Sequence, residues 1–225
     1  MTAVRRDSRA LGYASLEMRS DADIIKAVEH KRNMEEFFIE GLNQHGYVLE
    51  FVDKHMRDDD TVVMDAVRKD GHALKYASER LKNDVFVVVT ALIQDGYALK
   101  YVSEHLKDEK YVVMTAVRRG GLALKFASER LKDDMFVVRA AVRQDSAALQ
   151  FASERLKDDK FVVMSAVERN GNALQDASER LKDDIFVVRA AVLRTGSALQ
   201  YASERLKNDI DIRRIASGKA SDNSM

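Results

Sequence analysis

The chain has 225 residues, in which 37 lysine and arginine residues balance 37 aspartate and glutamate residues. This balance removes the bulk electrostatic attraction expected of a general binder of nucleic acid or of acidic membranes. The absence of cysteine excludes disulfides, thiol nucleophiles and cysteine-ligated metal sites, and the absence of proline and tryptophan fits a chain of short amphipathic helices.

The N-terminal segment resembles an interrupted repeat. Residues 1–15 match residues 114–128, so the chain begins inside a repeating unit. We predict an incomplete first repeat over 1–20 and an irregular repeat with an extra helix over 21–57. The uncovered apolar face of the first hairpin is a candidate surface for self-association. The same irregularity fits a fragment of a larger protein.

Six units of 25 residues follow over 58–207. The string ASER marks five of them and VSEH marks the sixth, at Ala77, Val102, Ala127, Ala152, Ala177 and Ala202. A period of this length indicates a repeat architecture. Residues 208–225 are predicted to form a partial capping helix and a disordered tail.

Each unit contains two apolar sets with helical spacing. Val137, Val138, Ala141 and Val142 occupy one face of a first helix, helix A, while residues 148, 149, 152 and 156 occupy one face of a second, helix B. Helices of about ten residues are too short to be stable alone and must stack. The sequence therefore predicts an all-α fold, an α-solenoid of 25-residue helix-turn-helix repeats.

Residues that favour the beginning or the end of a helix lie between these helices. A glycine follows helix A in most units, where a left-handed C-terminal residue favours glycine. Paired acids such as Asp133 and Asp134 precede the next helix A, where a carboxylate can cap free N–H groups.

The unit consensus D-D-x-x-V-V-x-x-A-V-x-x-x-G-x-A-L-x-Y-A-S-x-x-L-K covers most of the chain. It resembles the repeat family called domain of unknown function 4116, most specifically over 162–167 and 198–203. The resemblance implies short helical repeats. It implies no activity and no catalytic residues.

The recurrent polar and aromatic residues have structural explanations. The charged residues of the Ser-Glu-Arg-Leu-Lys segment are expected to form local pairs, such as Arg130 with Asp134 and Glu129 with Lys132. The alternative is a ladder of identical ligand-binding groups along one edge. Two aromatic columns are expected to pack between repeats rather than to stack on bases; they are Phe86, Tyr111, Phe136, Phe161 and Phe186, and Phe51, Tyr76, Tyr101, Phe126, Phe151 and Tyr201.

The five histidines lack the spacing of a metal site, and no phosphate-binding or nucleophile motif is present. We therefore predict no metal, no cofactor, no catalytic residue and no enzyme activity. No run approaches the roughly 18 apolar residues of a membrane span, and the N-terminus lacks a secretory signal. A soluble, intracellular and cytoplasmic protein without a membrane partner is expected.

Candidate binding residues come from the turn after helix A, which varies most between units, since variable turns on a repeat scaffold often recognise partners. They are Arg68, Lys69, His72, Tyr97, Arg118, Arg119, Leu122 and Arg143. Asp176 is added because it replaces an aromatic in its column, with Arg180 as the expected ion-pair partner.

The favoured function is a non-catalytic scaffold for protein–protein interaction with an unknown protein partner. One alternative is a modular nucleic-acid-binding repeat protein, which is disfavoured because the charge of each unit is near zero. The other is a fragment of a larger protein whose activity lies elsewhere.

Overall fold

The computed structural model describes residues 49–218. The predicted incomplete repeat over 1–20, most of the irregular repeat over 21–57, and the residues after 218 lie outside this part. The N-terminal self-association surface and the disordered C-terminal tail therefore stay predictions.

Every regular element in the described residues is helical, and each unit contains three of them: a long α-helix, a 3-10 helix and a single-turn α-helix. After the 3-10 helix η3 (Met56–Asp58), the units are α4 (Asp60–Lys69), η4 (Gly71–Tyr76) and α5 (Glu79–Lys82); α6 (Val85–Gln94), η5 (Gly96–Tyr101) and α7 (Glu104–Lys107); α8 (Lys110–Arg119), η6 (Gly121–Phe126) and α9 (Glu129–Lys132); α10 (Met135–Gln144), η7 (Ser146–Phe151) and α11 (Glu154–Lys157); α12 (Lys160–Val167), η8 (Gly171–Asp176) and α13 (Glu179–Lys182); and α14 (Ile185–Arg194), η9 (Gly196–Tyr201) and α15 (Glu204–Lys207), followed by α16 (Ile210–Ala216).

The all-α repeat fold is confirmed, but the prediction of one continuous helix B is wrong. Two extended residues divide it, for example Ala152 at φ −69° and ψ 157° and Ser153 at φ −60° and ψ 155°. The Ser153 hydroxyl accepts a hydrogen bond from the Leu156 N–H and so caps α11. A serine that caps a new helix ends the preceding one, since the capping residue has non-helical dihedrals.

The core is one continuous stack of small and branched apolar side chains. In the fourth unit both predicted apolar sets, including Val137, Val138 and Leu149, are buried, and the same columns are buried in the other units except at Val62 and Leu199, which are partly buried. Because no unit can bury these residues alone, each depends on its neighbours.

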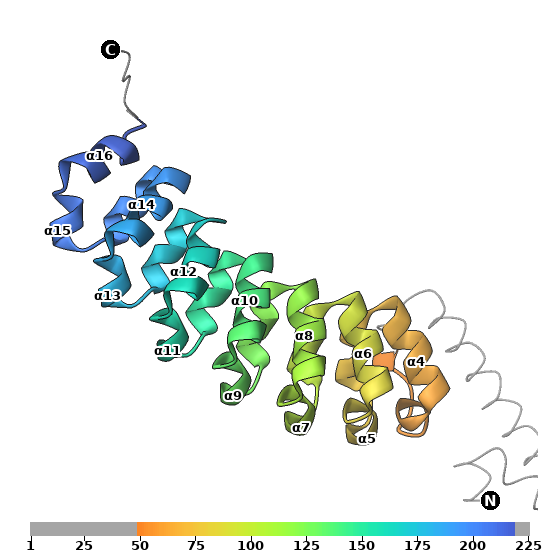
Figure 1. Ribbon diagram of the computed structural model, residues 1–225. Coiled ribbons are helices and arrows are strands. Elements are labelled where there is room, and N and C mark those ends of the chain that lie inside the picture. Colours follow the sequence, from red (N-terminus) through yellow and green to blue (C-terminus); the bar gives the residue numbers. More distant parts are fainter. Residues whose placement is uncertain (1–48, 219–225) are drawn as a thin grey trace, which may run out of the picture.

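Consecutive units are joined by backbone contacts. The Ser153 N–H donates to the Lys132 carbonyl of the preceding unit at 3.0 Å, and equivalent bonds occur at Ser78, Ser103, Ser128, Ser178 and Ser203. Figure 1 shows the result as a curved, elongated row of units from α4 to α14, with the single-turn helices α5 to α15 along one edge.

The glycines after the long helices have a different role from the predicted one. In the described residues only Gly218 has a positive φ. Gly96 instead lies against the next unit, where a Cβ atom would be 2.3 Å from the Ala116 carbonyl oxygen. Glycine therefore allows close approach of two backbones rather than a left-handed turn.

Candidate functional site

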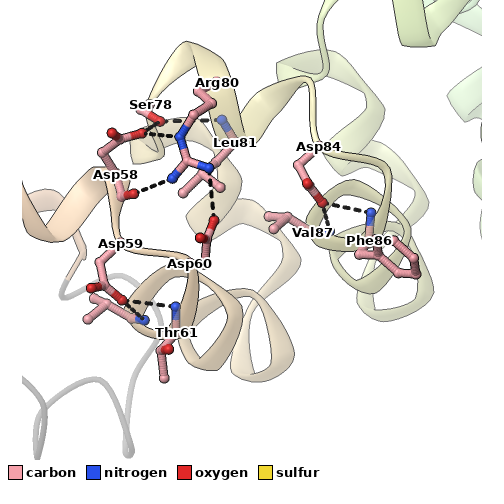
Figure 2. Close-up of polar contacts among 11 residues, drawn as sticks. Asp58, Asp59, Asp60, Thr61, Ser78, Arg80, Leu81, Asp84, Phe86 and Val87 are labelled. Atoms are coloured by element: carbon pink, nitrogen blue, oxygen red, sulfur yellow. Dashed lines mark hydrogen bonds and ion pairs between the residues drawn. The ribbon is translucent and has the colours of Figure 1, made fainter.

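The recurrent serine and arginine of each unit bind the aspartate at the junction before the long helix of the same unit. Ser78 and Arg80 both donate to the Asp58 carboxylate, and Arg80 also reaches the Asp58 carbonyl oxygen, as Figure 2 shows. We call this arrangement the clamp. It recurs in four other junctions, at Asp108 with Ser128 and Arg130, Asp133 with Ser153 and Arg155, Asp158 with Ser178 and Arg180, and Asp183 with Ser203 and Arg205.

The clamp changes the interpretation of the Ser-Glu-Arg-Leu-Lys segment. Glu129 pairs with Lys132 at 2.8 Å, as predicted. The predicted pair of Arg130 with Asp134 is wrong, because Arg130 binds Asp108 at 3.0 Å. The serine and arginine bonds hold the pKa of each clamp aspartate below its ordinary value. The segment therefore ties the end of each unit to its beginning and leaves no free ladder of ligand groups.

The second aspartate of each Asp-Asp pair caps a long helix, whereas Glu109 makes no such bond to α8. Asp134 accepts from the Phe136 and Val137 N–H groups at 2.9 and 3.1 Å, and Figure 2 shows Asp59 and Asp84 in the same role. Such caps satisfy N–H groups that the helix itself leaves unpaired.

The candidate turn residues divide into two groups. His72 lies 3.3 Å from the Asp95 carboxylate and contacts the Tyr101 ring edge-on, Tyr97 contacts Phe126 in the same way, and Leu122 packs against the core. These three therefore contribute to packing between units. The other candidates are exposed, namely Arg68, Lys69, Arg118, Arg119 and Arg143.

Asp176 is half-buried, and its predicted ion pair is wrong because Arg180 binds Asp158 at 2.9 Å. The Oδ2 atom of Asp176 is buried and has no hydrogen-bond partner among the described residues. Burial raises the pKa of this carboxyl group above its ordinary value. Asp176 is thus a weak point of one inter-unit contact.

The two aromatic columns have opposite environments. Tyr76, Tyr101, Phe126, Phe151 and Tyr201 are partly buried and pack against the core, as predicted, although Phe51 is exposed. The prediction is wrong for the other column, whose side chains are 66 to 79% exposed; we call it the aromatic ladder, and it consists of Phe86, Tyr111, Phe136, Phe161 and Phe186.

The fold does not require the aromatic ladder. Each ring is the second residue of a long helix, directly before the buried valine pair. In α4 the equivalent residue is Thr61 and in α16 it is Asp211, and both helices form and are capped by an aspartate. The rings must therefore be explained by something other than helix formation.

Two lysines lie over rings of the aromatic ladder. Lys110 Nζ lies 4.9 Å from the centre of the Phe136 ring and binds Asp134 at 2.7 Å. Lys160 repeats this arrangement with Phe186 and Asp184. The first residue of the intervening long helices is apolar, namely Val85, Met135 or Ile185. The ladder surface therefore repeats every two units.

No helix within residues 49–218 has both the length and the hydropathy of a membrane span. In the same residues no group of three or more His, Asp or Glu side chains is placed to hold a metal ion.

Six segments of the chain, most of them overlapping, match the family described as Domain of unknown function (DUF4116): residues 35–80, 59–107, 110–157, 137–182, 159–207 and 184–216. The chain belongs to the DUF4116 family. The resemblance noted in the unit consensus is thereby confirmed. No curated protein and no solved structure matched the chain.

The DUF4116 segments contain the whole aromatic ladder, and most of them span about two units. The family description gives no activity. The DUF4116 fold therefore explains the scaffold, while the role of the exposed rings has to be argued from their chemistry.

Proposed function

We propose that the protein is a non-catalytic scaffold that binds another protein through the exposed face of its long helices, with the aromatic ladder at one edge of that face. The observation that carries this proposal is the row of five exposed rings. Soluble proteins seldom expose apolar groups in an ordered array unless the array is an interaction site.

Energetics support this role. Transfer of one such side chain from water into an interface is worth about 1.5 to 3 kcal/mol. Aromatic residues are enriched among the side chains that dominate binding energy. Neighbouring rings belong to helices that pack about 8 to 10 Å apart, so three or four rings suffice for one partner segment.

The electrostatic surroundings favour protein over nucleic acid. Each ring lies two residues after an acid, namely Asp84, Glu109, Asp134, Asp159 or Asp184. Only Asp134 and Asp184 carry a lysine partner among the described residues. A phosphate chain that stacks its bases on the rings would pass these carboxylates, whereas single-strand binding needs a cationic track.

Single-stranded nucleic acid is the second candidate, because exposed aromatic side chains repeated along a groove are also its typical platform. The exposed turn residues Arg68, Lys69, Arg118, Arg119 and Arg143 serve as the rim of the surface in either case. Localisation to the cytoplasm is part of the same proposal.

The test replaces Tyr111, Phe136 and Phe161 by serine and compares proteins retained from cells of the source organism by quantitative mass spectrometry. The matched control replaces Gln150, Gln175 and Gln200, which are exposed and uncharged, by serine. We expect the ladder variant to lose a set of proteins that the control keeps, with both melting temperatures near that of the wild type. Equal retention by both variants would refute the proposal. Loss of oligonucleotide binding alone would favour the second candidate.

A further inference from the structure

A second feature of the same face is a polar groove of about 560 Å³ between α10 and α14. It crosses the end of α12 and is lined by Arg139, Arg143, Ser165, Glu168, Arg169 and Arg194. We call it the arginine groove. Four guanidinium groups there face one carboxylate, which gives the groove an excess of positive charge.

These arginines differ from the clamp arginines of the repeat units. Within residues 49–218, Arg80, Arg130, Arg155, Arg180 and Arg205 all form ion pairs in clamps. None of the four groove arginines has an ion-pair partner in that part of the chain. The fixed guanidinium forks of unpaired arginines suit carboxylate groups from outside.

The end of α12 helps to build the groove. Among α4 to α14, α12 is the one long helix that ends after eight residues, and the Arg169 N–H bonds to the Ala166 carbonyl three residues before it. Arg194 donates from Nε to the Arg169 carbonyl oxygen at 3.1 Å. This bond holds one groove arginine in place.

The preceding unit also differs, at the position of the closely packed glycines. Ser146 stands where the other units have a glycine whose missing Cβ leaves room for the next long helix. Its buried side chain lies at the position that faces the Ala166 turn.

The arginine groove and the aromatic ladder share one face. On α10, Phe136, Arg139 and Arg143 are separated by three and four residues, which places them in one row along the helix. A partner segment that lies on the rings would therefore bring its neighbouring residues to the arginines.

We propose that the arginine groove binds an acidic segment of the protein partner, whose carboxylate groups pair with Arg139, Arg143, Arg169 and Arg194. This inference rests on the proposed scaffold function and names the chemistry of its partner. A protein segment fits better than nucleic acid because the positive charge is local. The cationic residues extend to Arg118 and Arg119 on α8, but the equivalent residues of α6 are Ile93 and Gln94, so the positive charge does not continue along the whole array.

The test measures fluorescence anisotropy with a labelled peptide that carries six consecutive glutamates between glycine-serine flanks. Six extended residues span about 20 Å, which matches three stacked helices. The control peptide has six glutamines. We expect the glutamate peptide to bind more tightly, and its affinity to fall with added salt.

Two double variants locate the site. Arg143→Gln with Arg169→Gln removes two groove charges, while Lys100→Gln with Lys125→Gln removes two exposed charges on η5 and η6, in a column that holds glutamine in later units. We expect about tenfold weaker binding for the groove variant and less than twofold for the control. Equal weakening in both would overturn the inference, because it would show attraction to net charge alone.

Three further outcomes test the inference and the scaffold function separately. Tighter binding of a thymidine oligonucleotide than of the glutamate peptide, lost in the groove variant, would overturn the acidic-peptide inference. Failure of the glutamate peptide to bind, with partner loss still caused by the ladder variant, would overturn the inference alone. Binding of the glutamate peptide with no effect of the ladder variant on protein retention would refute the ladder as the binding site and leave the groove supported.

Discussion

The α-carbon of Gly121 faces the carbonyl oxygen of Ala141 in the next unit so closely that a Cβ atom would lie 2.4 Å from it. Gly121→Ala must therefore separate two backbones, and we expect a loss of about 1 to 3 kcal/mol of unfolding free energy. Urea unfolding measures this loss. Gly120→Ala is the control, since its Cβ would meet only the Tyr97 ring, at 3.5 Å, and its φ of −152° is extended. Equal effects at both positions would refute the role given to the close approach.

One junction lacks the clamp. At this position Asn83 accepts from the Ser103 hydroxyl at 2.6 Å, and His105 replaces the arginine. We expect Asn83→Asp combined with His105→Arg to raise the melting temperature by about 1 to 3 °C, because it adds an exposed ion pair with hydrogen bonds. Calorimetry of the two single variants and the double variant isolates the coupling. Additive single effects would mean that no clamp forms.

The clamps predict acid sensitivity. Hydrogen bonds from serine and arginine lower the pKa of Asp133, Asp158 and Asp183 below 3.8 in the folded chain. Their contribution to stability is therefore complete above that pH and is lost as the pH falls through the lowered values. Urea midpoints between pH 7 and pH 3 should fall less in a variant with all three changed to asparagine. An identical pH dependence in variant and wild type would contradict this linkage.

The ionised carboxyl group of Asp176 has the opposite effect on stability from those of the clamp aspartates. Burial raises its pKa above 3.8, so its protonated form is compatible with folding and the ionised form at neutral pH opposes it. We expect Asp176→Tyr to add about 1 kcal/mol at pH 7 by restoring the aromatic column, and less at pH 3. Gln175→Tyr, at an exposed neighbour, is the control. A destabilised Asp176→Tyr variant would exclude this position from the packed column.

Much of the scaffold could be predicted because its signals are local. The spacing of Val137, Val138, Ala141 and Val142 defines one buried helix face, and the structure buries that face. The division of helix B was missed because Ala148, Ala152 and Leu156 keep four-residue spacing across the break. Ser153 directly before Glu154 was the available signal, as serine is a preferred N-cap.

The errors concern contacts between residues far apart in the sequence. Arg130 has an acid four residues later and another 22 residues earlier, and the sequence does not show that the distant one is closer in space. The exposure of the ladder could have been found. At 3.6 residues per turn, Phe136 lies nearly opposite the centre of the Val137, Val138, Ala141 and Val142 face. The arginine groove depends on how three helices stack, which no single-unit pattern contains.

The alternation of Lys110 and Lys160 with Val85, Met135 and Ile185 limits how a partner can slide along the array. A shift by one unit would preserve every ring contact but would exchange an ammonium group for an apolar side chain. A shift by two units would restore both, at a translation of about 16 to 20 Å. A partner therefore has only a few equivalent binding positions along the array, spaced two units apart. The arginine groove lies at only one of them.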